Sequence, residues 1–265
     1  MRDYFSTALK LVCLVKYYCS VFLTKVRSYP PLALWLTALF LMYEQPPVNM
    51  VQGYIPTTML IFFIMVWFGY LFLSDFDTVT EHLIILQTNS RIVYAVSKIL
   101  FLLAISLAVS VIGGAFPVVV DLVTRARGAI YFADGIRIAD LFGGLILHFI
   151  VGTLGVSVAF LFHPNHNKRN DAITIVMLLS FALLAFVKHQ IFNFEGALRH
   201  LLLVFTPVYE IISRFSDKSV FILRDLAISA MYGGIYFAVI VFVGYWLYGR
   251  RVYGPRIAKE TTNAG

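Results

Sequence analysis

The chain is organised around the stretch Ser74–Phe101, SDFDTVTEHLIILQTNSRIVYAVSKILF, a long polar interruption between two strongly apolar runs. Thr78 and Glu81 have the T-x-x-E spacing of a capping box, which predicts that a helix begins near Thr78. Leucine and isoleucine in residues 83–86 give this helix an apolar face, and the run Gln87–Ser90 has the residue types of a turn. The stretch therefore predicts a short helix, a turn and the start of a membrane span.

Two cations flank the apolar run that follows the turn. Arg91 and Lys98 lie where cations border the cytoplasmic side of a span. A short capped helix on the inner face of the membrane suggests a docking site for a partner protein. The alternative is a connector that only reverses the direction of the chain.

The composition is that of an integral membrane protein. The 265 residues are 60% hydrophobic and 13% charged, with a mean hydropathy of +0.83, whereas soluble domains are about half apolar and a quarter charged. The apolar runs are long and lack the ten-residue alternation of a barrel strand, so an all-α polytopic fold is expected. The net charge of +7 is interpreted as a topology signal, and no nucleic acid is expected as a partner.

A single transmembrane domain, residues 1–265, is predicted. Residues 1–27 form an interfacial helix, with a first span as the rival interpretation, although Lys10, Lys16, Lys25 and Arg27 make a span costly there. Six spans follow, over residues 29–44, 54–73, 92–120, 141–162, 172–187 and 226–248. Glycines of the fourth span provide close-packing faces; they are Gly143, Gly144, Gly152 and Gly155. Between the last two spans, two short re-entrant helices broken near Pro207 are expected on the outer side.

Charge gives the orientation of these spans. The first outside loop has no Lys or Arg, the loop 163–171 carries Lys168 and Arg169, and the tail from Gly249 is basic. A charged loop, Asp121–Asp140, is expected outside. Both termini are therefore predicted to be cytoplasmic, in a multi-pass protein of the bacterial plasma membrane.

Motifs of catalysis are missing from the sequence. It contains no H-E-x-x-H, no G-x-S-x-G and no P-loop, so any nucleotide hydrolysis is expected on another chain. His163-x-x-His166 has too few ligands for a metal site, and none is predicted. His148 is an ionisable residue inside a span, which makes it a candidate for substrate contact. The alternative is a neutral histidine bonded to a neighbouring helix.

The chain resembles the permease subunits of type 2 ATP-binding-cassette transporters. The resemblance is carried by the interfacial helix, the six spans and the region between spans two and three. There Glu81, the run Leu83–Leu86, Asn89-Ser90-Arg91 and Ser97-Lys98 are similar to the family's coupling region. A weaker similarity is Thr206–Glu210, TPVYE, to the stretch before the last span of the family. The family's Glu-Arg-Gly is replaced here by Glu81-His82-Leu83.

The resemblance implies an exporter built from two permease copies and two cytosolic ATPase subunits, which would hold the ATP and Mg. The coupling helix would contact the ATPase through Thr78, Glu81, His82, Leu83, Leu86 and Arg91. A second inner-face contact would involve His166, Lys168 and Arg169. The path between the two copies would run along spans two and five, with His148, Pro207 and Tyr209 as candidate substrate contacts.

The expected cargo is an amphipathic or hydrophobic molecule such as a peptide, drug or lipid. Two other functions compete with the exporter. One is an intramembrane lipid-modifying enzyme, and the other is a non-transporting scaffold or immunity protein that contacts membrane lipid and needs no ATP.

Overall fold

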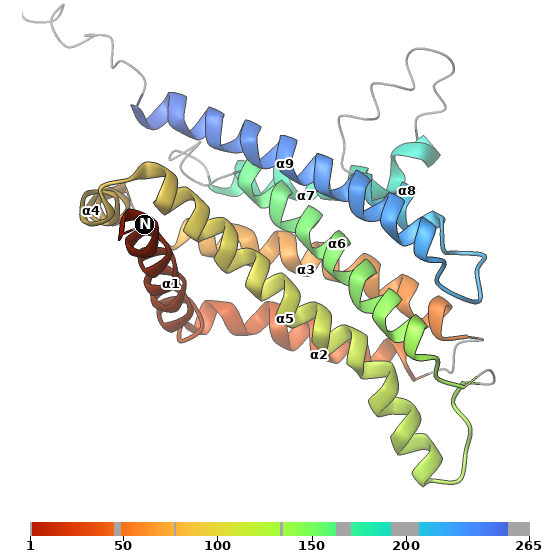
Figure 1. The fold of residues 1–265 in the computed structure, drawn as a ribbon. Coiled ribbons are helices and arrows are strands. Elements are labelled where there is room, and N and C mark those ends of the chain that lie inside the picture. The colour runs from red at the N-terminus through yellow and green to blue at the C-terminus, as the bar shows by residue number, and fades with distance from the viewer. Residues whose placement is uncertain are drawn as a thin grey trace, which may run out of the picture.

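A computed structural model describes residues 2–44, 49–76, 78–132, 135–162, 171–191 and 207–253. Within these ranges the chain is helical and contains no strand, as the sequence predicts. The helices form one elongated bundle, with α1 (Arg2–Phe22) and α4 (Thr78–Thr88) at one end (Figure 1). The C-terminal end of α9 (Leu223–Tyr253) lies at this same end.

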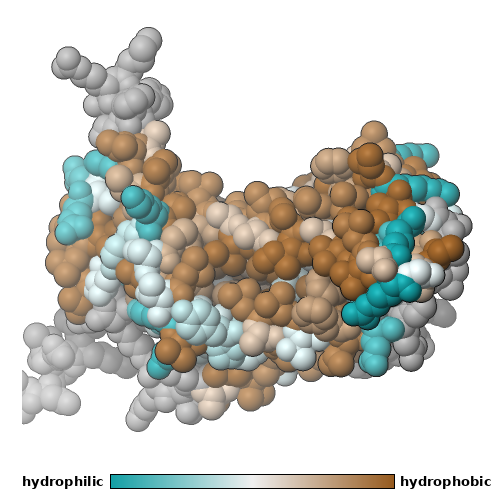
Figure 2. All heavy atoms as spheres, turned by 90° about the horizontal axis from the view of Figure 1, so that it is seen from below, coloured by the Kyte–Doolittle hydropathy of each residue, from teal (hydrophilic) through white to brown (hydrophobic). Residues whose placement is uncertain are grey.

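Four of the described helices are long and apolar enough to cross a membrane. They are α3 (Met50–Ser74), α5 (Arg91–Ala126), α6 (Ile138–Leu161) and the Leu223–Tyr248 part of α9. α3 and α6 run toward the α4 end of the bundle, and α5 runs away from it (Figure 1). On the face seen in Figure 2, hydrophilic residues gather toward the two ends and hydrophobic ones lie between them. The predicted multi-pass membrane character is thus supported.

The first predicted span is the short helix α2 (Tyr29–Met42). Its 14 residues make about 21 Å of helix, less than the bilayer core of about 30 Å. A short 3-10 helix, η1 (Val26–Ser28), separates α2 from α1, and the two arms meet at 89°. Counted as one broken span, this pair would make a fifth crossing.

The fifth predicted span corresponds to α7 (Asp171–Ile191), whose apolar part, Ala172–Val187, is shorter than the four long helices. Of the two expected re-entrant helices, the second is α8 (Val208–Ser213), a helix of six residues that begins directly after Pro207. The first falls in residues 192–206, outside the described residues.

Two helices continue well beyond the predicted ends of their spans. α5 continues through Ala126, so the loop begins at Arg127 and not at Asp121. Asp121 accepts a hydrogen bond from Nε of Arg125 at 2.6 Å, an i,i+4 ion pair that supports the added turns. α9 continues through Tyr253, beyond the predicted tail boundary at Gly249.

Close packing of α3 against α6 forms the centre of the bundle. A Cβ on Gly155 would lie 2.4 Å from the backbone oxygen of Phe62, and one on Gly144 would lie 2.3 Å from the Tyr54 ring. Only glycine allows so close an approach of the two helices. The predicted glycine packing faces of the fourth span are confirmed.

An aromatic cluster holds α1 against the bundle. Tyr18 and Phe22 of α1 are buried, and the Phe22 ring lies 5.6 Å from Phe72 of α3 and 5.9 Å from Phe101 of α5. Tyr18 makes edge contacts with Phe72 and Phe76 at 5.4 and 5.3 Å. Since aromatic side chains bury large apolar areas, these contacts fix α1 across the ends of α3 and α5.

Candidate functional site

The helix α4 (Thr78–Thr88) begins where its sequence predicts and continues through Gln87 and Thr88, the first two residues of the predicted turn. Asn89 ends it with a φ of 51°, and among non-glycine residues asparagine is one of the few that adopt this left-handed conformation readily. Ser90 then caps α5, because its hydroxyl accepts a hydrogen bond from the Val93 amide at 3.3 Å. Only Asn89 and Ser90 separate α4 from α5, and both have defined conformations. This short turn fixes α4 relative to α5.

The carboxylate of Glu81 points into the bundle. The T-x-x-E spacing predicts that Glu81 turns back to cap its own helix, and the resemblance implies that it contacts an ATPase. The structure instead buries Glu81 completely, at 0% exposure, and its oxygens accept hydrogen bonds from other helices. The predicted direct contact with a partner therefore does not fit the position of this side chain.

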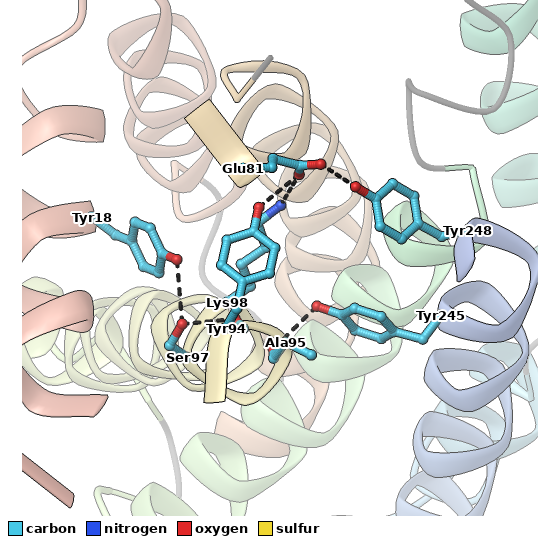
Figure 3. Close-up of polar contacts among 8 residues, drawn as sticks. All are labelled: Tyr18, Glu81, Tyr94, Ala95, Ser97, Lys98, Tyr245 and Tyr248. Atoms are coloured by element: carbon cyan, nitrogen blue, oxygen red, sulfur yellow. Dashed lines mark hydrogen bonds and ion pairs between the residues drawn. The ribbon is translucent and has the colours of Figure 1, made fainter. Parts of the chain in front are cut away.

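Three side chains from two helices donate to Glu81 (Figure 3). On α5, Tyr94 and Lys98 are one turn apart and reach the same oxygen, Oε1, at 2.7 and 2.5 Å. From the end of α9, the Tyr248 hydroxyl donates to Oε2. We call these four residues, Glu81, Tyr94, Lys98 and Tyr248, the Glu81 cluster.

The Glu81 cluster is enclosed by protein. Lys98 is only 2% exposed, and a buried cation is costly unless it is paired. Its Nζ lies 4.5 Å from the centre of the Tyr94 ring and 5.4 Å from that of Phe76, so two aromatic faces add to the ion pair with Glu81. The cluster thus combines a buried ion pair with charge-assisted hydrogen bonds, the stronger kind.

Three further hydrogen bonds surround this cluster, two between neutral groups and one donated by a lysine. The Tyr18 hydroxyl lies 3.3 Å from the Ser97 hydroxyl, which ties α1 to α5. Tyr245 donates to the Ala95 carbonyl at 3.1 Å and ties α9 to α5. Lys10 of α1 donates to the carbonyl of the last α4 residue at 3.1 Å. At this end of the bundle, α1, α4, α5 and α9 are therefore joined by polar contacts.

The opposite side of α4 is exposed and largely apolar. Val79, Leu83 and Leu86 are 66%, 55% and 75% exposed, and His82 is exposed beside them. A groove of about 450 Å³ runs between α1 and α4, lined by Cys13, Leu14, Tyr17, Thr80, Leu83, Ile84 and Gln87. The exposed predicted contacts His82, Leu83 and Leu86 thus lie on one short helix at the end of the bundle, next to a groove.

Of the remaining predicted inner-face residues, two lie in described helices and three do not. Thr78 is the first residue of α4, and Arg91 is the exposed first residue of α5, so both lie near this surface. His166, Lys168 and Arg169 lie outside the described residues.

His148 lies in the core, away from the Glu81 cluster. Its side chain is fully buried, and Nδ1 donates to the Gly144 carbonyl at 2.8 Å, because a carbonyl can only accept. Nε2 lies 3.1 Å from the Thr57 hydroxyl of α3, and Thr58 lies 3.5 Å from Nδ1. We call His148, Gly144, Thr57 and Thr58 the His148 cluster. It matches the alternative interpretation, a histidine bonded to a neighbouring helix.

Pro207 and Tyr209 belong to a separate region. Pro207 is buried immediately before α8, and Tyr209, within α8, is partly buried. In Figure 1, α8 lies toward the end of the bundle away from α4. The structure therefore does not bring these two residues together with the predicted coupling residues.

The sequence placed Lys98 in the coupling region without a site role, and Tyr94 and Tyr248 were not predicted to belong to the site. Lys98 and Tyr94 had a usable signal, because a cation and a tyrosine four residues apart share one helix face, which also carries buried Phe101. Tyr248 had none, since it is 167 positions from Glu81. Nothing local in either segment indicates that they meet.

The Glu81 cluster connects helices through its carboxylate. Among the described residues no group of three or more His, Cys, Asp and Glu side chains lies close enough together to hold a metal ion. Tyr94, Lys98 and Tyr248 each donate a hydrogen bond to Glu81, so the carboxylate acts as a common acceptor for α5 and α9. Comparison of the chain with protein-family models, with curated proteins and with solved structures finds no match.

Proposed function

We propose that this chain is the permease subunit of an ATP-driven exporter of the type 2 ATP-binding-cassette class, with α4 as its coupling helix. The observation that carries the proposal is the two-sided construction of α4. One side is fastened to α5 and α9 through Glu81, and the other presents Leu83 and Leu86 at the end of the bundle. Exposed leucines beside a groove are typical of a protein-docking surface.

Force transmission explains why both sides are needed. A partner that moves α4 can change the membrane helices only if α4 and those helices move together. The buried ion pair with Lys98 and the Tyr248 hydrogen bond supply this connection to two long helices.

The full proposal follows the family resemblance. α1 is the interfacial helix, and the six spans are α2, α3, α5, α6, α7 and α9. Two copies pair, and each α4 receives one cytosolic ATPase subunit, which holds the ATP and Mg. An amphipathic or hydrophobic cargo leaves the cytoplasm along α3 and α7, beneath α8. Both termini and α4 are cytoplasmic, in the bacterial plasma membrane.

The test is capture of an ATP-hydrolysing partner through α4. The tagged chain is purified from its native membrane, and the associated protein is assayed for ATP hydrolysis and identified by mass spectrometry. Leu83→Asp with Leu86→Asp is expected to abolish capture, because charges replace the apolar contact. Leu223→Asp is the matched control, since Leu223 is 79% exposed at the start of α9 and is expected to retain the partner. Glu81 is left unchanged because it is part of the fold.

Three outcomes contradict the proposal. The first is an ATPase that stays bound to the double variant when size-exclusion chromatography shows it folded. The second is turnover of lipid by the purified chain without an ATPase, which identifies an enzyme. The third is protection of cells that persists when ATP hydrolysis by the associated protein is blocked, which identifies a scaffold or immunity protein.

A further inference from the structure

An apolar groove opens on the flank of the bundle between α2, α3 and α7. It has a volume of about 440 Å³ and is lined by side chains that include Leu34 of α2, Phe63 and Trp67 of α3, and Leu178 and Leu179 of α7. Apart from the Tyr70 hydroxyl and the Trp67 indole nitrogen, the lining side chains are hydrocarbon. A polar solute needs placed hydrogen-bonding groups in its site, so this wall suits a hydrocarbon chain.

The groove faces outward. Leu34, Trp67 and Leu179 are 49%, 39% and 50% exposed. In a membrane this surface lies at the depth of the bilayer, because α3 is one of the four helices long enough to cross it, and it belongs to the α3–α7 flank that the proposed cargo path follows. A chain can therefore enter sideways from the bilayer.

A second cavity continues the groove toward the bend between α1 and α2. It has a volume of about 450 Å³ and shares Trp67, Tyr70, Leu71 and Ile175 with the first. Arg27, Pro30 and Ser74 complete its lining. The apolar groove thus leads, at the α4 end of the bundle, to a mouth that contains a cation.

The cation at this mouth is available to a ligand. Arg27 lies in η1, is exposed, and makes no ion pair with any described residue. Nearby, Lys25 forms an ion pair with Asp75 at 3.2 Å, and these two charges offset each other. The net charge at the mouth is therefore the positive charge of Arg27. η1 is held in place because the buried Ser28 donates its hydroxyl hydrogen to the Lys25 carbonyl at 2.7 Å.

We infer that the continuous groove binds an anionic phospholipid from the leaflet on the α4 side. One acyl chain lies between α2, α3 and α7, and the phosphate lies at Arg27. A guanidinium matches phosphate oxygens in geometry as well as charge. Trp67 and Tyr70, shared by both cavities, lie between chain and headgroup, where aromatic side chains with a polar edge are favoured. This inference concerns a resident lipid and stands apart from the proposed ATPase.

The test measures lipid retained by the purified chain in detergent. Native mass spectrometry compares phosphatidylglycerol with phosphatidylcholine of identical acyl chains. Wild type is expected to prefer phosphatidylglycerol by about fivefold, the effect of one basic residue near an anionic lipid surface. Arg27→Gln is expected to remove the preference, and Leu179→Trp, which fills the groove, to lower retention of both lipids. Glycerol phosphate, which has no acyl chain, is expected not to displace the lipid.

The matched control is Lys16→Gln, which removes one exposed positive charge from α1 outside both cavities and is expected to keep the preference. An unchanged preference in Arg27→Gln, or unchanged retention in Leu179→Trp, overturns the inference. A Leu179→Cys variant is then oxidised in native membranes beside the wild type, which has Cys13 and Cys19. A dimer specific to the variant, with no lipid retained by the wild type, assigns the groove to a second copy and also overturns the inference.

Discussion

The Glu81 cluster and the His148 cluster are both buried and polar, yet they are built from different chemistry. The first contains an ion pair and joins α4, α5 and α9 at one end of the bundle. The second contains neutral groups and joins α3 to α6 inside it, beside glycine contacts. Charge is concentrated where a short helix must be held to two long ones, and neutral packing is used where long helices already meet along their length.

The largest expected effect comes from removing the acceptor of the charged cluster. Glu81→Gln leaves Lys98 as a buried, unpaired cation, which should cost about 3–5 kcal/mol of stability. Chemical unfolding in detergent, followed by helix content, measures the change. Adding Lys98→Met should recover part of the loss; a double variant as unstable as Glu81→Gln would show that the ion pair is not the cause.

Two tyrosines of α9 allow a charged and a neutral hydrogen-bond acceptor to be compared within one helix. Tyr248→Phe removes a hydrogen bond to a carboxylate and should cost about 1.5–3 kcal/mol. Tyr245→Phe removes one to the Ala95 carbonyl at 3.1 Å and should cost about 1 kcal/mol. The same unfolding assay measures both, and equal losses would show that the charge of the Glu81 acceptor adds no stability.

The neutral cluster should respond to volume. Gly144→Ala places a Cβ 2.3 Å from the Tyr54 ring, and overpacking of this kind should cost about 1–3 kcal/mol. Gly234→Ala on α9 is the control, because its Cβ meets no atom within 4 Å, and it should be neutral or slightly stabilising. Thermal unfolding of the two variants compares them. A stable Gly144→Ala would mean that α3 and α6 are not closely packed.

The smallest effect is expected on the outer side of α4. Leu86→Ser alters a side chain that is 75% exposed, so stability should change by less than about 0.5 kcal/mol. Its unfolding midpoint should match that of the wild type within error. A large loss would place Leu86 in a contact that the single chain does not make, such as one with a second copy.

Local signals predicted the elements well. The T-x-x-E spacing and Asn89 predicted α4, and the glycines of residues 143–155 predicted the packing face of α6. In each case the information lies within a few turns of one helix. The same reasoning put the start of a loop at Asp121, because it treated a charge as the end of a span. An i,i+4 pair with Arg125 continues the helix instead.

The direction of Glu81 could not be predicted in this way. In a capping box, the Glu81 carboxylate would accept a hydrogen bond from the backbone at the start of its own helix. In the structure it instead accepts hydrogen bonds from side chains of α5 and α9. Lys98 decides the outcome, because a lysine buried on the inner face of α5 requires an anion. Both residues are visible in the sequence, but only the packing of α5 in the structure shows that the Lys98 side chain is buried.

The length of α5 has a further consequence. Its 36 residues extend about 54 Å, nearly twice the hydrocarbon thickness of about 30 Å. At the tilts usual for membrane helices, up to about 40°, such a helix must emerge from the bilayer, and its C-terminal turns carry the polar residues Asp121 and Arg125. Nitroxide labels at successive sites along α5 would therefore report the depth of each site in the bilayer. This measurement would position the protein in the membrane independently of what it carries.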